Sequence, residues 1–319
     1  MKKYVYDVKR IIKRRIDYAK KKGEEQLLNK YNNSVFSAYI HFFRDIEGMT
    51  EKSSSIKAEE LMNVLNNNEK FVIPRLVVNI TDRCTLQCKE CSALIPYFKK
   101  RSEAEYDLLI QDIDKILNIV DEIICLEFIG GEPLLYSKLE ALLQYTQKIS
   151  KIKMVEITTN ATIVPNEELI QVLKNEKTLV QISEYKNIDK QKIGEVQKIL
   201  EENSIKYKVL EMDRWYSYGN ADKRMRSKRE LLYSYYYCND NESCRTLYDG
   251  KIFVCGRAAA LYGIGKLTDN SSFLEVRQND KITSENIKDF YLHKKYAEAC
   301  DFCDVSRDVL KVVEVAEQC

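Results

Sequence analysis

The chain has 319 residues, of which 45% are hydrophobic and 31% are charged, and its formal net charge at pH 7 is +2. Its length suits one large α/β domain with a smaller appendage, and its composition suits a protein that buries a full core. A charge this close to zero gives no reason to expect nucleic acid as a partner. No long apolar stretch follows the basic start, so neither a signal peptide nor a transmembrane segment is indicated, and we expect a cytoplasmic location.

Residues 1–73 predict a helical N-terminal extension. The pattern indicates a basic helix through residue 22, a second helix over residues 24–47 and a third over residues 55–66, with no strand pattern between them. The pattern changes after this extension, so we expect the first domain boundary near residue 73.

From Phe71 onward, short β-rich runs alternate with amphipathic helical windows, which is typical of parallel βα units. Such a series closes into a full or partial barrel, with its working residues at the carboxyl ends of the strands. The predicted strands are Arg75–Ile80, Ile123–Ile129, Met154–Thr158, Leu179–Ile182 and Tyr207–Leu210, and the predicted helices are Tyr106–Val120, Lys138–Ser150, Asn166–Asn175 and Lys190–Asn203.

Ten cysteines indicate metal sites rather than a disulfide framework, because the chain is neither small nor preceded by an export signal. One group is Cys84, Cys88 and Cys91, spaced C-x3-C-x2-C after the first predicted strand. Three thiolates can hold an iron–sulfur cube and leave its fourth iron without a protein ligand. Zinc and unligated thiols are the alternatives. Structural zinc usually takes four ligands, and neither histidine of the chain, His41 or His293, is close in sequence.

Three further motifs follow on successive predicted strands: Gly130–Pro133, Thr158–Asn160 and Ser183–Tyr185. Together with the cysteine spacing, this series resembles the radical S-adenosylmethionine (SAM) superfamily over about residues 74–212. The resemblance implies a [4Fe-4S] cluster on Cys84, Cys88 and Cys91, whose open iron chelates the amino and carboxylate groups of SAM. It also implies cofactor contacts from Gly130, Gly131, Glu132 and Pro133 to the SAM amine, and from Thr159, Asn160, Ser183 and Glu184 to its ribose and carboxylate. One departure is Glu90, because members of the superfamily often carry an aromatic residue there, near the adenine.

A second group of cysteines lies near the C-terminus. Cys244 and Cys255 flank a turn glycine and a short β run, which predicts a hairpin, and Cys300 and Cys303 form a later C-x2-C pair. This group resembles the shortened SPASM, or twitch, extension and implies an auxiliary [4Fe-4S] cluster on these four cysteines. Cys238 is an alternative to Cys244 or a spare thiol, and a zinc ribbon is the alternative to the cluster.

We expect the remaining cysteines, Cys125 and Cys319, to bind no metal. Cys125 lies in an apolar run, so we expect it to face the core of a strand. Cys319 is expected to be a frayed end. An epimerisation requires a free cysteine near the substrate, and the cysteines outside the proposed clusters are Cys125, Cys238 and Cys319.

We therefore expect an α/β fold in three parts. Residues 1–73 are the helical extension, residues 74–228 a partial (β/α)6 TIM-like radical SAM barrel, and residues 229–319 a small iron–sulfur domain of the SPASM or twitch kind. The second boundary falls where an aromatic segment gives way to the basic run Lys223–Arg229.

The resemblance implies reductive cleavage of SAM to a 5′-deoxyadenosyl radical, which removes a hydrogen atom from the substrate. Dehydrogenation, epimerisation and cross-linking are the outcomes left open. The run from Cys244 to Ala259 also resembles radical SAM proteins of carbohydrate assembly, so a sugar or nucleotide-linked sugar is the expected substrate. A ribosomally made peptide is the alternative, and the expected electron donor is a reductant such as flavodoxin or ferredoxin. A zinc-stapled binding protein without catalysis is the alternative from another class.

Overall fold

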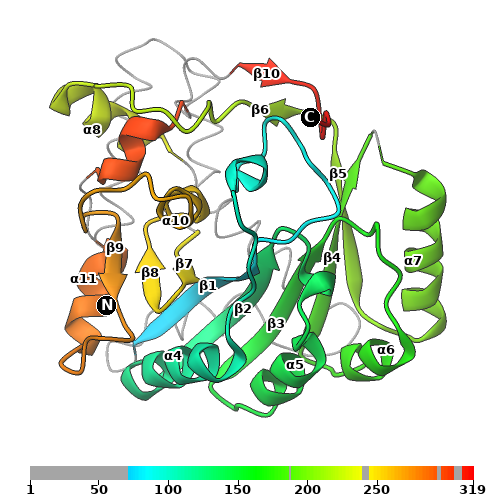
Figure 1. The fold of residues 1–319 in the computed structure, drawn as a ribbon. Helices are drawn as coiled ribbons and strands as arrows, with labels where there is room; N and C mark the ends of the chain where they lie inside the picture. Colours follow the sequence, from blue (N-terminus) through cyan, green and yellow to red (C-terminus); the bar gives the residue numbers. More distant parts are fainter. Residues whose placement is uncertain (1–70, 187, 239–243, 293–295, 305–310) are drawn as a thin grey trace, which may run out of the picture. The chain divides into compact units, whose positions relative to one another are not determined.

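The computed structural model describes residues 71–319, apart from residues 187, 239–243, 293–295 and 305–310 (Figure 1). The chain divides into two compact units, Met1–Val72 and Ile73–Cys319, and the account below concerns the second. The three helices predicted in the N-terminal extension lie outside the described residues. No helix in the described part of the chain combines the length and the hydropathy of a membrane span.

Five successive strands, β1 to β5, form one side of a single sheet and are joined by helices (Figure 1). Strands β2 to β5 pair in parallel, as the alternation of β and α segments predicts. The strands are β1 (Val72–Thr81), β2 (Glu122–Gly130), β3 (Ile152–Thr159), β4 (Thr178–Tyr185) and β5 (Tyr207–Met212), and the helices are α4 (Tyr106–Ile119), α5 (Leu139–Gln147), α6 (Glu167–Leu173) and α7 (Lys190–Glu202). Each predicted strand and helix of this series is confirmed, and each strand extends beyond its predicted bounds by between two and four residues.

The C-terminal residues continue the same sheet. Strand β7 (Thr246–Tyr248) pairs in parallel with β1, and it forms the predicted hairpin with β8 (Lys251–Phe253), which pairs with β9 (Phe273–Glu275). The sheet order is β5-β4-β3-β2-β1-β7-β8-β9, so β5 and β9 are its edges in the described part of the chain. The fold is therefore a mixed α/β fold with an open sheet, as a partial barrel requires. Because this sheet continues past residue 228, the boundary between residues 228 and 229 stays a prediction.

Short elements surround this sheet. Strands β6 (Trp215–Tyr216) and β10 (Val312–Val313) pair in antiparallel fashion. The others are η1 (Ile95–Tyr97), η2 (Pro133–Leu135), α8 (Lys228–Tyr237), α10 (Gly256–Gly263), α11 (Ser284–Leu292) and η3 (Glu298–Phe302).

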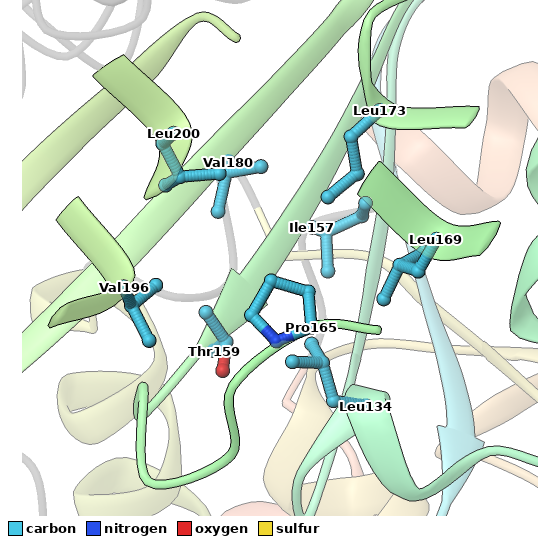
Figure 2. Close-up of a pocket in the computed structure, with 9 residues that line it drawn as sticks. All are labelled: Leu134, Ile157, Thr159, Pro165, Leu169, Leu173, Val180, Val196 and Leu200. Atoms are coloured by element: carbon cyan, nitrogen blue, oxygen red, sulfur yellow. The ribbon is translucent and has the colours of Figure 1, made fainter. Parts of the chain in front are cut away.

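One face of the sheet is apolar and packs against helices. Ile157 of β3 and Val180 of β4 point toward Leu169 of α6 and toward Val196 and Leu200 of α7 (Figure 2). The gap among these side chains has a volume of about 10 Å³, which is no larger than one water molecule needs. This face is therefore core and offers no ligand site.

The opposite face carries charged groups, because successive strand residues point to opposite sides. Arg75 Nε donates to Glu127 Oε2 at 2.8 Å, and Arg75 and Lys208 both form ion pairs with Glu156. Cys125 is fully buried on this face, and its Sγ lies 3.8 Å from Glu156 Oε2. Burial raises the pKa of Cys125 well above its ordinary value, so the residue stays a neutral thiol. The prediction that Cys125 faces the core is confirmed.

The packing of side chains around the β7–β8 hairpin can be tested at Phe253. Phe253 is fully buried, and its ring centroid lies 5.3 Å from that of Tyr262 and 5.4 Å from that of Phe273. We expect Phe253→Ala to lower the free energy of unfolding by about 3–5 kcal/mol, because it removes an aromatic ring and leaves a cavity. Urea denaturation measures this change. Met225→Ala is the control, since that side chain is 80% exposed, and an equal loss in both variants would contradict the packing.

Candidate functional site

The three predicted cluster ligands lie on the loop that follows β1. Burial raises the pKa of Cys84 to about 11, and the nearby thiols of Cys91 and Cys88 contribute in the same direction. Burial also raises the pKa values of Cys88 and Cys91. The structure thus brings the three thiols together, and they stay protonated near neutral pH until a metal centre displaces the protons.

The residues at the end of β2 bind residues 81–83, the segment that leads from β1 into the cysteine loop. Gly131 N donates to Thr81 O at 2.8 Å, and Glu132 N donates to Arg83 O at 2.7 Å. A Cβ atom at Gly130 would stand 2.2 Å from Thr81 O, and one at Gly131 would stand 2.2 Å from Arg83 O. Both glycines are therefore required by the close approach of two backbones, whatever the ligand.

Glu132 joins this segment to the end of β3. Its carboxylate is fully buried and accepts hydrogen bonds from Thr159 Oγ1 at 2.7 Å, Asn160 N at 2.9 Å and Leu134 N at 3.1 Å. Burial raises the pKa of Glu132, while these donors oppose the rise. Because protein donors already occupy its oxygens, Glu132 positions the neighbouring segments. A direct contact of Glu132 or of the buried Pro133 with SAM stays a prediction.

Asn160 links the end of β3 back to the cysteine loop. Its Nδ2 lies 3.7 Å from Cys84 Sγ and 3.2 Å from Thr85 Oγ1. An amide donor directed at a cysteine sulfur stabilises the thiolate form that a metal needs. Cys84, Glu132 and Asn160, which the sequence placed in three separate motifs, therefore form one connected group.

The two residues predicted on β4 point in different directions. Ser183 is buried, on the same side of the strand as Gln181 and Tyr185. Glu184 points to the other side, where its Oε1 lies 3.9 Å from Lys190 Nζ of α7. The structure brings Ser183 toward the site and Glu184 toward a helix, and the SAM contacts of both stay predictions.

Tyr185 was not predicted as a site residue. It is packed against the group of Cys88, Val315 and Ala316, and its ring lies 5.2 Å from that of Trp215 in an edge-on arrangement. Burial raises the pKa of Tyr185, and the thiols of the cysteine loop add to the rise. Tyr185 lies two residues after Ser183, so strand alternation could have predicted that both side chains point to the same side of β4.

The C-terminal segment also holds the cysteine loop, and sequence analysis missed this. Lys89 N donates to Glu317 O at 2.8 Å, and Cys319 N donates to Gln87 O at 2.8 Å. The side chain of Gln318 accepts from Gln87 N at 2.7 Å and donates to Cys88 Sγ at 3.4 Å. The expectation that Cys319 is a frayed end is wrong, because its backbone amide is paired with the cysteine loop.

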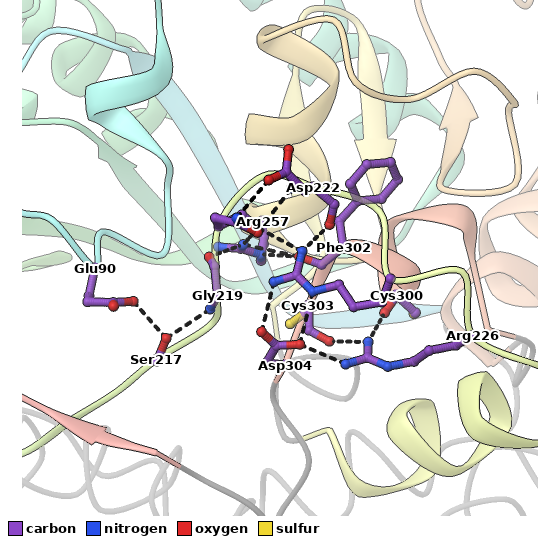
Figure 3. Close-up of polar contacts among 12 residues, drawn as sticks. Glu90, Ser217, Gly219, Asp222, Arg226, Arg257, Cys300, Phe302, Cys303 and Asp304 are labelled. Carbon is purple, nitrogen blue, oxygen red and sulfur yellow. Dashed lines mark hydrogen bonds and ion pairs between the residues drawn. The ribbon is translucent and has the colours of Figure 1, made fainter.

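Glu90 has a structural partner in place of the aromatic contact usual in the superfamily. Ser217 Oγ donates to Glu90 Oε2 at 2.7 Å, and Gly219 N donates to the same hydroxyl (Figure 3). Glu90 therefore ties the cysteine loop to the segment that follows β6.

Two arginines hold the C-terminal cysteine pair. Arg226 Nη1 donates to Cys300 O at 3.2 Å and Cys303 O at 2.6 Å, and its Nη2 pairs with Asp304 Oδ1 at 2.7 Å (Figure 3). Arg257, two residues after Cys255, donates through Nη2 to backbone oxygens that include Gly219 O and Phe302 O (Figure 3). These contacts fix the backbone around Cys300 and Cys303, two of the predicted ligands of the second metal centre.

Arg257 tests whether an anionic group fits there. The residue is 5% exposed, its hydrogen bonds go to carbonyl oxygens, and its Nη1 has no partner among the described residues. Burial lowers the pKa of Arg257, and the nearby sulfurs of Cys303 and Cys255 oppose the fall. A buried cation needs an anion, and a metal held by four thiolates carries a net negative charge. The residues present therefore fit a metal–thiolate centre.

The other predicted ligands of this centre occupy different surroundings. Cys238 and Cys300 both act electrostatically on Tyr235, whereas Cys244 acts on Arg75. Burial raises the pKa of Cys300 to about 11. All five C-terminal cysteines stay predicted ligands, with Cys238 and Cys244 as alternatives for one position.

Across the described residues, no three Cys, His, Asp or Glu side chains converge closely enough to share one metal ion. Thiolates that share one zinc ion stand about 3.8 Å apart, as Zn–S bonds of about 2.3 Å in a tetrahedron require. Each thiolate of an iron–sulfur cube binds a different iron, so those ligands are spread more widely. The observation therefore concerns single-ion sites and not a cube.

Residues 78–183 match the sequence model of the Radical SAM superfamily. GTP 3',8-cyclase of Clostridium botulinum (strain Okra / Type B1) is 33% identical over 106 residues, which are 32% of this chain and 31% of the relative. Molybdenum cofactor biosynthesis protein 1 of Dictyostelium discoideum is 27% identical over 156 residues, which are 43% of this chain and 22% of the relative. The matched segments span less than a third of these relatives' length.

Two solved structures have a similar fold. Native anSMEcpe with bound AdoMet and Cp18Cys peptide has a TM-score of 0.48 and 15% sequence identity, and the match covers 74% of this chain and 85% of that chain. BtrN in complex with AdoMet and 2-DOIA has a TM-score of 0.45 and 14% identity, and the match covers 75% of this chain and 98% of that chain.

The glycine contacts give the first test of the site. Gly131→Ala forces apart the backbones that hold Cys84 in place, so we expect a loss of more than half of the iron bound after anaerobic reconstitution. Iron analysis of the desalted protein measures this. Gly194→Ala is the matched control, because a Cβ there meets nothing within 4 Å, and we expect full iron binding with unchanged or higher stability. Equal iron content in both variants would count against the proposed geometry.

Gln318 gives the second test. Gln318→Leu keeps the side-chain size but removes the N–H donor to Cys88 Sγ and the acceptor for Gln87 N. We expect iron to be lost to a chelator about tenfold faster and the midpoint potential of the cluster to fall, because hydrogen bonds to sulfur stabilise the reduced form. Chelator kinetics and potentiometric titration measure these changes. Gln171→Leu, at an exposed position on α6, should change neither, and unchanged values for Gln318→Leu would exclude this role.

Proposed function

We propose that this chain is a radical SAM enzyme that cleaves SAM reductively and removes a hydrogen atom from an organic substrate. The observation that carries the proposal is the connected group of Cys84, Glu132 and Asn160, since it joins the cysteine loop to the two segments that we expect to contact SAM. The superfamily uses a [4Fe-4S] cluster and SAM as cofactors, and the match to its sequence model covers residues 78–183.

The residues have distinct roles in this proposal. Cys84, Cys88 and Cys91 hold the cluster through their thiolates. Asn160 and Gln318 direct N–H groups at two of these sulfurs, which favours the thiolate form and fixes the loop. When bound, the cluster and SAM supply the 5′-deoxyadenosyl radical, and that chemistry belongs to the cofactors.

The protein also covers Cys88 with hydrophobic side chains. Val315, Ala316, Tyr185 and Trp215 pack around Cys88, and they come from segments far apart in the sequence. A dry site protects a reactive radical from side reactions. This packing supports radical chemistry at the cysteine loop.

We propose that Cys255, Cys300 and Cys303, with Cys244 or Cys238, hold an auxiliary [4Fe-4S] cluster of the SPASM or twitch kind. The buried Arg257 and the Arg226 contacts support this proposal. When bound, such a cluster supplies an electron acceptor or conduit, which suits a dehydrogenation, a cross-link or an epimerisation. Full burial makes Cys125 unsuitable as the hydrogen donor of an epimerisation, and Cys238 and Cys319 are the cysteines left for it.

A sugar or a nucleotide-linked sugar is the substrate class we propose. The relatives named GTP 3',8-cyclase support it, because GTP is a nucleotide that contains a ribose. A ribosomally made peptide is the alternative substrate. The proposed setting is the cytoplasm, where a reductant such as flavodoxin or ferredoxin is available to supply the electron.

The proposal predicts two properties of the anaerobically reconstituted protein. We expect about eight irons per chain, as two cubes of four require, and formation of 5′-deoxyadenosine from SAM and dithionite. The variant in which Cys84, Cys88 and Cys91 are all Ala should form no 5′-deoxyadenosine, while Cys300→Ala/Cys303→Ala should retain the uncoupled cleavage of SAM. Metal analysis and chromatography of the products measure these outcomes.

Other results would contradict part or all of this proposal. Zinc without cleavage of SAM would remove the catalytic proposal and leave a metal-stapled binding protein. About four irons with intact cleavage would remove only the auxiliary cluster. Deuterium transfer into 5′-deoxyadenosine from a labelled nucleotide sugar, but not from a labelled peptide, would support the sugar class.

A further inference from the structure

A polar cavity lies next to the segment that leads into the cysteine loop. Its volume is about 510 Å³, which falls in the range of small-molecule sites. The end of β1, the loop before α4, the first half of α4, the turn between β7 and β8, and the end of α10 form its walls. None of the residues predicted to bind the cluster or SAM lines it.

Two buried oxygens in the wall lack hydrogen-bond donors. Asn79 is 7% exposed and Asp82 is 1% exposed, and the Oδ1 atoms of both have no partner among the described residues. The other oxygen of Asp82 accepts from Ser102 Oγ at 3.1 Å and from the Tyr248 hydroxyl at 3.0 Å. An unsatisfied buried acceptor is unfavourable, so a ligand that donates to these oxygens would be bound favourably.

The charge of the walls favours a cation. One arginine, Arg277, faces five carboxylates, and it is committed to Asp112 through two hydrogen bonds and to Asp249 through an ion pair at 3.0 Å. Glu105 accepts from the backbone at the start of α4. The carboxylates of the cavity are Asp82, Glu103, Glu105, Asp112 and Asp249. Asp82, like Glu105, forms no ion pair among the described residues. Burial raises the pKa of Asp82 while the charge of Arg101 opposes the rise, so a cation bound beside Asp82 would favour its ionised form.

We propose that this cavity binds a small organic amine in its protonated form, whose ammonium group donates hydrogen bonds to Asp82 Oδ1 and Asn79 Oδ1. An organic cation suits the site better than a metal ion, because no three acidic, histidine or cysteine side chains of the described residues converge on one point. The walls also include Leu108, Leu109 and Tyr262, which contact the carbon skeleton of such a ligand. The proposal does not depend on the chemistry of the cysteine loop.

Isothermal titration calorimetry on the reconstituted full chain tests this proposal. The probes are glucosamine and putrescine, each compared with a neutral counterpart, N-acetylglucosamine and 1,4-butanediol. We expect saturable 1:1 binding of at least one amine, with its neutral counterpart at least tenfold weaker. Asp82→Asn and Asn79→Leu should each weaken the amine about tenfold, as the loss of a charge-assisted hydrogen bond predicts.

Asp249→Asn is the matched control, since this carboxylate lies at the same cavity, is already paired with Arg277 and is half exposed. It should change the affinity by less than about twofold. Equal losses for Asp82→Asn and Asp249→Asn would indicate diffuse attraction to an acidic surface and would overturn the proposal. Binding of MgCl2 without binding of either amine, or equal affinity for amines and neutral counterparts, would also overturn it.

Two measurements keep the outcome clear. Circular dichroism shows whether each variant folds, and Asn79→Leu carries the test if Asp82→Asn does not. Iron analysis of each variant separates this proposal from the proposed function, because Asp82 lies two residues before Cys84. Amine binding with no iron bound would support the cavity and not the enzyme, and the reverse result would support the enzyme and not the cavity.

Discussion

The close approach of β2 to the chain that leaves β1 determines the position of the cysteine loop. Two backbone hydrogen bonds, from Gly131 N to Thr81 O and from Glu132 N to Arg83 O, join the two segments. They require that no side chain stands between the backbones, which the two glycines provide. Glu132 then carries the connection to β3, and Asn160 returns it to Cys84. The ends of three strands are thereby fixed around one set of thiols.

The C-terminal part of the chain supports this arrangement from the other side of the loop. Residues 317–319 pair with residues 87–89, and Ser217 binds Glu90. Next to them, Arg226 and Arg257 hold the backbone around Cys300 and Cys303. A buried guanidinium whose hydrogen bonds go to carbonyl oxygens is costly without an anion nearby, and the anions near Arg257 are Asp304 and the thiolates that Cys255 and Cys303 would present to a metal.

The order of strands and helices could be predicted from the sequence, because short β-rich apolar runs alternate with windows in which apolar residues recur every three to four residues. The sequence also predicted that the segments after β1, β2 and β3 lie close together, since they follow successive parallel strands, and hydrogen bonds join these segments in the structure. It misjudged where strands end. Ser183 and Glu184 were expected to follow β4 but lie within it, so alternation sends Glu184 to the side of α7.

Contacts between segments far apart in the sequence could not be predicted, because no local sequence pattern indicates them. The pairing of Cys319 with Gln87 and the hydrogen bond from Gln318 to Cys88 join residues more than 200 positions apart, and no periodicity encodes them. The buried oxygens of Asn79 and Asp82 likewise became evident only once the cavity around them was described. Burial and long-range pairing depend on the assembled fold, whereas the motifs depend on nearest neighbours in sequence.

The central claim is that Cys84, Cys88 and Cys91 hold a cluster with an iron that is open to SAM. Electron paramagnetic resonance of the dithionite-reduced protein, recorded with and without SAM in the Cys300→Ala/Cys303→Ala variant, tests it most directly, because the auxiliary cluster then does not contribute. We expect the signal of a reduced [4Fe-4S] cluster whose g values change when SAM is added. A signal that SAM leaves unchanged, or no such signal in an iron-loaded protein, would contradict it.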